Sequence, residues 1–211
     1  MFLNMFYSIV KGMLSILIWL FFKFKVFGVE NIPKEGGVII ASNHASYLDI
    51  PFLACGIGRS CDFVAKSELF SNRVFGWILK RLGTFPVKRG SIDRWAISET
   101  IRRLGDGRVI VIYPEGARSK DGRLSEPKRG IGMVVALSGA KVIPSFIMGT
   151  DSVLPRGAKR IRPNPVRLYL GSPLDFSSLI SVKKGKELYT QISEEIMMGI
   201  GDLEAKAKGM D

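Results

Sequence analysis

The stretch VIIASNHASYLDIPFLACG, residues 38–56, places an apolar run directly before a polar turn and a helical pattern. The run at 38–42 is apolar without alternation, which is typical of a strand covered on both faces of a sheet. Asn43 and Ser46 are both suitable N-caps for the helix that follows. The turn holds His44, the only histidine in 211 residues, and Asp49 follows five positions later.

The pair His44 and Asp49 is the first candidate for chemistry. The turn folds the two side chains toward each other, so the carboxylate can accept a hydrogen bond from one ring nitrogen. That bond fixes the tautomer and leaves the other nitrogen free to take a proton near neutral pH. The arrangement is the base and its orienting acid from a triad, without a protein nucleophile. The alternative is a histidine at a strand end beside an ordinary acid at a helix start.

The rest of the chain repeats the order of strand, turn and helix. Near-continuous apolar strands that alternate with helices predict an α/β fold with a mixed, mostly parallel sheet flanked by helices on both faces. Pro144 lies inside one apolar run and indicates an edge strand or a wall position. We expect strands at 36–42, 61–66, 83–88, 108–114, 141–149 and 165–174, and helices at 47–56, 71–82, 91–105, 129–139 and 184–207.

Residues 1–27 form a strongly apolar segment before the α/β domain, which we place at 28–211. No small-residue cleavage site follows the apolar part, which argues against a signal peptide. On a helical wheel, Asn4, Ser8, Lys11 and Ser15 form one polar stripe. This pattern favours an amphipathic membrane anchor with Lys11, Lys23 and Lys25 at headgroup level, a monotopic association. A helix that spans the bilayer and a helix packed on a partner protein are the alternatives.

The formal charge of +12 and the pI of about 9.9 favour anionic partners. Nucleic acid, anionic lipid headgroups and an acidic carrier protein all fit the charge. A nucleic-acid binder is disfavoured, since the arginines lack regularly spaced aromatic partners and no recognition motif occurs. Cys55 and Cys61 are interpreted as free thiols in a reducing compartment, with a covalent acyl-cysteine mechanism as a rival. A non-catalytic membrane adaptor is the other rival.

Two further motifs include the ends of predicted strands and the turns after them. GTFPVKRG, residues 83–90, supplies Lys88 and Arg89, whose guanidinium fork matches phosphate oxygens. YPEGARS, residues 113–119, supplies Glu115, Gly116 and Arg118. Gly116 lets the backbone approach a ligand, and we expect Glu115 to hold a ligand hydroxyl or to orient Arg118 or Arg89. An ordinary solvated turn explains the first motif equally well, but it does not explain the pairing of acid and arginine in the second.

In order and spacing, these blocks resemble the glycerolipid acyltransferase family, specifically its 1-acylglycerol-3-phosphate (lysophosphatidate) acyltransferase branch. The resemblance covers roughly residues 35–150. Tyr113 stands where the family usually has Phe, Ala117 where Thr is common, and Lys88 where many members have Asp. Lys66 lies in AKSELF, which also resembles a family stretch and makes it a lesser candidate for substrate contact. The matching positions are Asn43, His44 and Asp49, then Gly83, Phe85 and Arg89, then 113–119, then Ile143 and Pro144.

The resemblance implies transfer of a fatty acyl chain from a thioester to the sn-2 hydroxyl of lysophosphatidate, which gives phosphatidate. It implies His44 as general base and Asp49 as its support, with Arg89 and Arg118 on the acceptor phosphate and Lys88 as a further candidate there. The donor is acyl carrier protein or coenzyme A thioester, and no metal or other cofactor is required. Glycerol-3-phosphate or another lysolipid is an alternative acceptor. The expected location is the cytoplasmic face of the cell membrane, on an anionic lipid surface.

Overall fold

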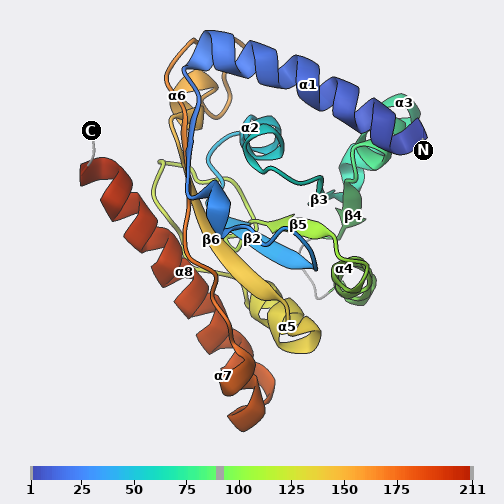
Figure 1. The fold of residues 1–211 in the computed structure, drawn as a ribbon, viewed down its shortest axis with the longest axis vertical. Helices are drawn as coiled ribbons and strands as arrows, with labels where there is room; N and C mark the ends of the chain where they lie inside the picture. The colour runs from blue at the N-terminus through green and yellow to red at the C-terminus, as the bar shows by residue number, and fades with distance from the viewer. Residues whose placement is uncertain (1, 89–92, 210–211) are drawn as a thin grey trace.

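A computed structural model of the chain describes residues 2–88 and 93–209, and in it helices cover both faces of one sheet (Figure 1). The described residues form seven strands in the order β1-β7-β6-β2-β5-β3-β4. Neighbouring strands run parallel except for β6 and β7, which are antiparallel. The predicted α/β fold with a mixed, mostly parallel sheet is therefore confirmed.

The strands follow the apolar runs of the sequence. Along β2, alternate residues enter two separate cores: Val38 and Ile40 join one, and Ile39 and Ala41 join the other. A strand buried on both faces needs no polar positions, which explains its unbroken apolar sequence. The strands are β1 (Lys25–Phe27), β2 (Val38–Ser42), β3 (Cys61–Lys66), β4 (Phe85–Val87), β5 (Val109–Ile112), β6 (Lys141–Met148) and β7 (Arg167–Leu170).

The helices divide between the two cores. Side chains from α1, α2 and α6 enter the first core, and side chains from α4, α5, α7 and α8 enter the second. Short 3-10 turns lie at Val29–Asn31 and Ser67–Phe70. The helices are α1 (Phe2–Phe22), α2 (Asp49–Gly56), α3 (Arg73–Arg81), α4 (Arg94–Gly105), α5 (Arg129–Ser138), α6 (Thr150–Val153), α7 (Ser177–Val182) and α8 (Gly185–Gly209).

Helix α1 lies across the α2 side of the molecule (Figure 1), and Lys11 of its predicted polar stripe points inward. Lys11 Nζ donates to the carbonyl of Ile57 at 2.7 Å, just beyond the end of α2. The placement of Lys11 at headgroup level was therefore wrong: its ammonium satisfies carbonyls at a helix C-terminus, where a cation is favourable. In the described part of the chain, no helix has the length and apolarity to cross a bilayer.

The sheet includes the end of the segment predicted as an appendage. Strand β1 pairs with β7 in parallel, with Val26 opposite Leu168. Residues 25–27 thus belong to the sheet although they lie before the predicted boundary at residue 27. A three-residue strand leaves little periodic signal, and for this reason the sequence pattern missed it, together with the short helices α6 and α7.

Pro144 lies in β6, which has β2 and β7 on its two sides. The prediction of an edge strand was therefore wrong. The carbonyl of Pro144 accepts from Gly171 N at 2.8 Å, so a backbone N–H at this residue would point to the same side. Strand β7 has already ended at Leu170. The N–H that proline lacks would therefore lie where the pairing of β6 with β7 has stopped. For this reason the proline is tolerated inside the sheet.

Candidate active site

The His44 and Asp49 side chains meet at the carboxyl end of β2, as predicted. His44 Nδ1 lies 2.7 Å from Asp49 Oδ2, and the two residues are 7% and 0% exposed. Because an ionised carboxylate can only accept, Nδ1 carries the proton in this bond and Nε2 remains available as a base. Asp49 is the first residue of α2, where a negative charge is favourable. The pair can therefore act as base and orienting acid.

The turn between the two residues is organised by the same carboxylate. Asp49 Oδ2 also accepts from the backbone N–H groups of Ala45 at 2.8 Å and Ser46 at 3.0 Å. These bonds pull residues 44–46 around the carboxylate, which brings the imidazole back toward it. Local sequence is sufficient for this geometry, which is why the pair could be predicted.

Thr150 is a member of the site that the sequence pattern did not reveal. Its Oγ1 donates to Asp49 Oδ1 at 2.5 Å, and both side chains are buried. Thr150 begins α6 directly after β6, the neighbour of β2, so the contact joins positions that are 101 residues apart. The signal that the sequence offered for Thr150 was its hydroxyl group, which directly follows the predicted strand at 141–149 at the same edge of the sheet. With both oxygens bonded, the Asp49 carboxylate has a fixed orientation.

Asn43 and Ser46 hold the turn rather than the helix. The Asn43 side chain donates to the carbonyl of Ile147 at 3.0 Å and accepts from its N–H at 2.8 Å. Ser46 Oγ donates to the carbonyl of Leu154 at 3.0 Å. The N-cap of α2 is Leu48, which has no side-chain cap. The prediction of Asn43 or Ser46 as the N-cap was wrong, because their side chains instead satisfy backbone groups in β6 and the segment after α6.

Tyr113 stacks on the His44 ring. The ring centroids are 3.9 Å apart and the planes differ by 14°. The Tyr113 hydroxyl is buried and has no hydrogen-bond partner among the described residues. Burial, and then the charge of Asp49, raise the pKa of this phenol well above its usual value. Tyr113 is therefore neutral, and its contribution to the site is the flat face that holds the imidazole in plane.

Glu115 links the loop that follows β5 to the turn at residues 44–49. Its Oε1 accepts from His44 N at 3.0 Å, and its Oε2 accepts from Ser125 Oγ at 2.7 Å. In the described residues its bonds go to these groups rather than to Arg118, so the prediction that Glu115 orients Arg118 was wrong. The buried carboxylate satisfies backbone and hydroxyl donors of two segments. Gly116 completes the turn with φ of 72°, a conformation that suits glycine.

Arg118 lies beside the turn at residues 44–49. Its guanidinium carbon is 3.6 Å from the centroid of the Tyr47 ring, a cation–π contact that fixes the side chain. Ser119 N donates to the carbonyl of His44 at 2.7 Å, which ties the Arg118 segment to His44. The structure therefore brings Arg118 and His44 together.

Lys66 and Lys88 lie at the same edge of the sheet but farther from β2. Both side chains are exposed, and Lys66 pairs with Val87 where β3 and β4 end. Strand β5 lies between β2 and β3, which puts Lys66 about 10 Å and Lys88 about 14 Å from β2 along the sheet. Arg89 was predicted beside Lys88 and lies outside the described residues.

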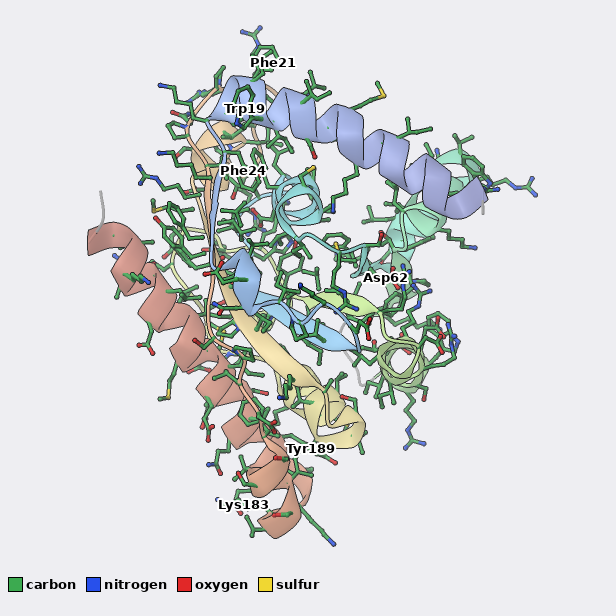
Figure 2. All side chains as sticks on the ribbon, in the orientation of Figure 1. Trp19, Phe21, Phe24, Asp62, Lys183 and Tyr189 are labelled. Atoms are coloured by element: carbon green, nitrogen blue, oxygen red, sulfur yellow. The ribbon has the colours of Figure 1, made fainter. Side chains whose placement is uncertain are left out.

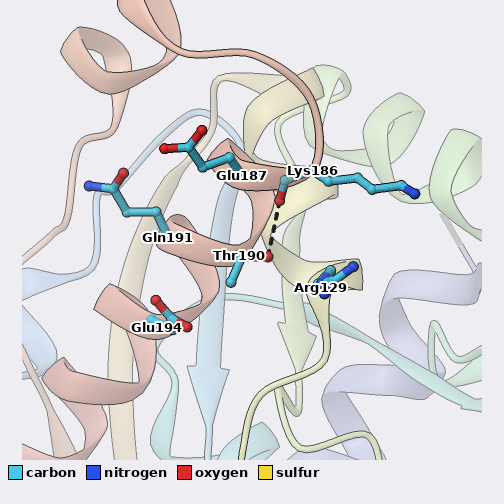
Figure 3. A pocket seen from close by; sticks show the side chains of 6 residues that line it. All are labelled: Arg129, Lys186, Glu187, Thr190, Gln191 and Glu194. Atoms are coloured by element: carbon cyan, nitrogen blue, oxygen red, sulfur yellow. Dashed lines mark hydrogen bonds between the residues drawn. The ribbon is translucent and has the colours of Figure 1, made fainter.

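Two other features do not contribute to this constellation. Burial raises the pKa of the Cys55 thiol, which disfavours the thiolate that an acyl-cysteine mechanism needs. A hollow of about 560 Å³ lies between α5 and α8 (Figure 3). None of the predicted site residues that the structure describes lines it; its walls are Arg129, Lys186, Glu187, Thr190, Gln191 and Glu194.

The arrangement can be compared with known proteins. A family model described as Acyltransferase matches residues 23–148, more than half of the chain. The chain belongs to the Acyltransferase family. The family expected from the sequence motifs is thus confirmed, and the matched region contains His44, Asp49 and Arg118.

The chain is similar to proteins named 1-acyl-sn-glycerol-3-phosphate acyltransferase. The chloroplastic LPAT1 of Arabidopsis thaliana is 34% identical over 79% of this chain and 48% of that protein. The Bacillus subtilis protein is 32% identical over 86% of this chain and 88% of that protein. The chain thus spans about half the length of the chloroplast relative and most of the bacterial one.

A solved structure has the same fold. The crystal structure of PlsC, the 1-acyl-sn-glycerophosphate acyltransferase of Thermotoga maritima, aligns with a TM-score of 0.74 and 30% identity. The alignment covers 94% of this chain and 81% of that one. The α/β sheet and the position of its helices are therefore shared with that protein.

Proposed function

We propose that this protein transfers a fatty acyl chain from a thioester to the sn-2 hydroxyl of lysophosphatidate, giving phosphatidate for phospholipid synthesis. The observation that carries the proposal is the buried bond between His44 and Asp49, 2.7 Å long, in a chain of the Acyltransferase family. The names of the relatives support this acceptor. The donor is an acyl thioester of acyl carrier protein or coenzyme A.

The chemistry needs one base and no protein nucleophile. His44 Nε2 takes the proton of the acceptor hydroxyl while the oxygen attacks the thioester carbonyl. The new ester C–O bond forms, the C–S bond breaks, and the imidazolium returns the proton to the leaving thiolate. Asp49 stays ionised and stabilises the imidazolium, and its second oxygen is held by Thr150. Because the acceptor attacks the thioester directly, positioning is a large part of the rate.

The acceptor phosphate is assigned to the cations at the same edge of the sheet. Arg118 is held against Tyr47 next to the catalytic turn. Lys66 and Lys88, at the ends of β3 and β4, add positive charge along the edge. Arg89 joins them in this proposal on the strength of its motif alone. A guanidinium matches phosphate oxygens in a fork, so Arg118 is the main contact in the proposal.

The outer face of α1 is proposed to lie on the membrane that supplies the acceptor. The described side chains on this face are exposed and apolar, with Ile16 at 68% and Trp19 at 73%. Trp19 and Phe21 lie on α1 in Figure 2, with Phe21 pointing away from the body of the protein. An apolar helix face that is left unburied by its own domain suits the interface of a bilayer.

The test is an acyl-transfer assay that crosses both donors with lysophosphatidate, glycerol-3-phosphate and a lysophospholipid lacking the phosphomonoester. We expect lysophosphatidate to be preferred. His44→Ala should lower turnover about 10²- to 10⁴-fold while lysophosphatidate still binds. Near-normal turnover in this variant, or preference for another acceptor, would contradict the proposal.

A further inference from the structure

The loop at residues 155–163 is strongly basic and has no role in the chemistry described so far. Its sequence PRGAKRIRP contains four cations and no acid. The cations are Arg156, Lys159, Arg160 and Arg162, and all four are exposed. Among the described residues, none of them is paired with a carboxylate. Unneutralised charge concentrated in nine residues calls for an anionic partner.

The chain that follows the loop is fastened to the end of α1 at Val166. Val166 N donates to the carbonyl of Phe22 at 3.0 Å, and Lys25 N donates to the carbonyl of Val166 at 3.1 Å. Figure 1 shows the chain between α6 and β7 beside the C-terminal end of α1. Lys23 and Lys25, which follow α1, are also exposed. Basic side chains therefore surround the end of the helix whose outer face is apolar.

The loop also carries an exposed apolar side chain between two of its arginines. Ile161 is 56% exposed, and Arg160 and Arg162 flank it. The loop holds its shape through Arg162 N, which donates to the carbonyl of Val153 at 2.8 Å. Apolar side chains beside cations are typical of a surface that inserts into a bilayer with its charges at headgroup level.

We propose that the 155–163 loop is a second membrane contact, which binds anionic lipid headgroups and sets the protein's preference for negatively charged bilayers. Lys159, Arg160 and Arg162 contact headgroup phosphates, and Ile161 enters the acyl boundary. This inference rests on the membrane association in the proposed function. An acidic carrier protein is the competing occupant. The position of the loop near the C-terminal end of α1, whose outer face is apolar, favours the membrane, because a soluble carrier does not need that face.

The loop also borders the catalytic turn. Ser46 Oγ donates to Leu154 O, the residue before the loop, at 3.0 Å, and Arg156 Nη1 lies 3.4 Å from the carbonyl of Arg118. Headgroups bound at 159–162 would thus lie next to the proposed acceptor site. Arg156 is left unchanged in the test because of this contact with the site.

The test compares two triple variants in a vesicle flotation assay. The first is Lys159→Gln, Arg160→Gln and Arg162→Gln. The second removes the same charge elsewhere, by Lys183→Gln, Lys184→Gln and Lys186→Gln; Lys183 lies at the opposite end of the molecule from α1 (Figure 2). The vesicles contain phosphatidylcholine alone or phosphatidylcholine mixed with phosphatidylglycerol, at low and high salt.

We expect the loop variant to bind the anionic vesicles at least about tenfold more weakly, since each cation near a charged bilayer contributes about fivefold. Its binding to phosphatidylcholine should be unchanged, and its salt dependence should be smaller. The control variant should stay within about twofold of the wild type, because its cations are proposed to face away from the bilayer. Equal losses in both variants would assign the effect to net charge and overturn the inference, as would no loss in the loop variant.

Two further measurements separate the alternatives. Ile161→Ser should weaken binding to both kinds of vesicle by about tenfold, as expected for an inserted aliphatic side chain. If the loop variant keeps its vesicle binding but loses transfer from acyl carrier protein and not from acyl coenzyme A, the loop docks the carrier and the inference is wrong. Transfer to detergent-dispersed lysophosphatidate from acyl coenzyme A should be unchanged in the loop variant. If the wild type transfers an acyl chain from neither donor to detergent-dispersed lysophosphatidate, the proposed function fails while the flotation result still decides the role of the loop.

Discussion

The Thr150 hydroxyl lies 2.5 Å from Asp49 Oδ1, on the carboxylate whose other oxygen holds His44. His44, the proposed base, is therefore one end of a chain of three side chains that comes from two strand ends. Asp49 is fully buried, so rotation of its carboxylate would leave polar groups without partners. Thr150 acts through Asp49 and is a positioning residue in the proposed reaction.

Replacement of Thr150 tests this support. Thr150→Val should lower kcat by about tenfold or more, since a hydrogen bond to a charged group contributes about 1.5–3 kcal/mol. The KM for lysophosphatidate should not change, because Thr150 is not proposed to touch the acceptor. Thr150→Ser keeps the hydroxyl and should restore most of the turnover. Steady-state kinetics on the three proteins would refute the role if Ser and Val were equally impaired.

Tyr113 offers a matched pair of substitutions. Tyr113→Phe keeps the ring on His44 and removes a buried hydroxyl that has no partner among the described residues. We expect activity to persist and the free energy of unfolding to rise by about 1 kcal/mol. Tyr113→Leu removes the flat face and should lower kcat. Denaturant unfolding and kinetics on both variants check this, and a loss of activity in Tyr113→Phe would mean that the hydroxyl itself is used.

Arg118 is expected to act on binding. Arg118→Ala should raise the KM for lysophosphatidate with a smaller change in kcat, since the phosphate is held in the ground state and the transition state alike. Tyr47→Leu removes the ring beneath the guanidinium and should give a weaker effect in the same direction. Arg89→Ala should resemble Arg118→Ala if its motif has been interpreted correctly. A fall in kcat alone would contradict phosphate binding by either arginine.

The outer face of α1 can be tested without deletion. Removing residues 1–27 would also remove β1 from the sheet, so loss of binding would be ambiguous. Ile16→Asp with Leu20→Asp places charge on the exposed face and should abolish flotation with phosphatidylcholine vesicles. Val182→Asp with Met198→Asp changes equally exposed apolar residues on α7 and α8 and serves as control. If both pairs float like the wild type, α1 is not the membrane contact.

The parts that the sequence predicts well depend on short-range order. The strands other than β1 were visible as apolar runs, and His44 meets Asp49 because one turn and its backbone N–H groups join them. The contact of Thr150 with Asp49 could not be predicted in this way, because it depends on β6 lying beside β2. No local sequence pattern contains the strand order. The sequence pattern did not predict that the Lys11 side chain points into the molecule, for a related reason. A helical wheel identifies a polar stripe, but it cannot tell whether that stripe meets water or carbonyls at the end of another helix.

The loop that carries Arg118 forms hydrogen bonds with both backbone polar groups of His44. Glu115 accepts from the His44 N–H, and Ser119 N donates to the His44 carbonyl. Redesign of this loop to accommodate a different headgroup would therefore displace the imidazole as well. Substitution of the exposed Lys66 and Lys88 is a better way to alter the choice of acceptor, because they lie at the ends of strands that do not adjoin β2. Under this fold, variation in headgroup preference should accumulate at those distant strand ends, while the segment 115–119 stays fixed by the base that it supports.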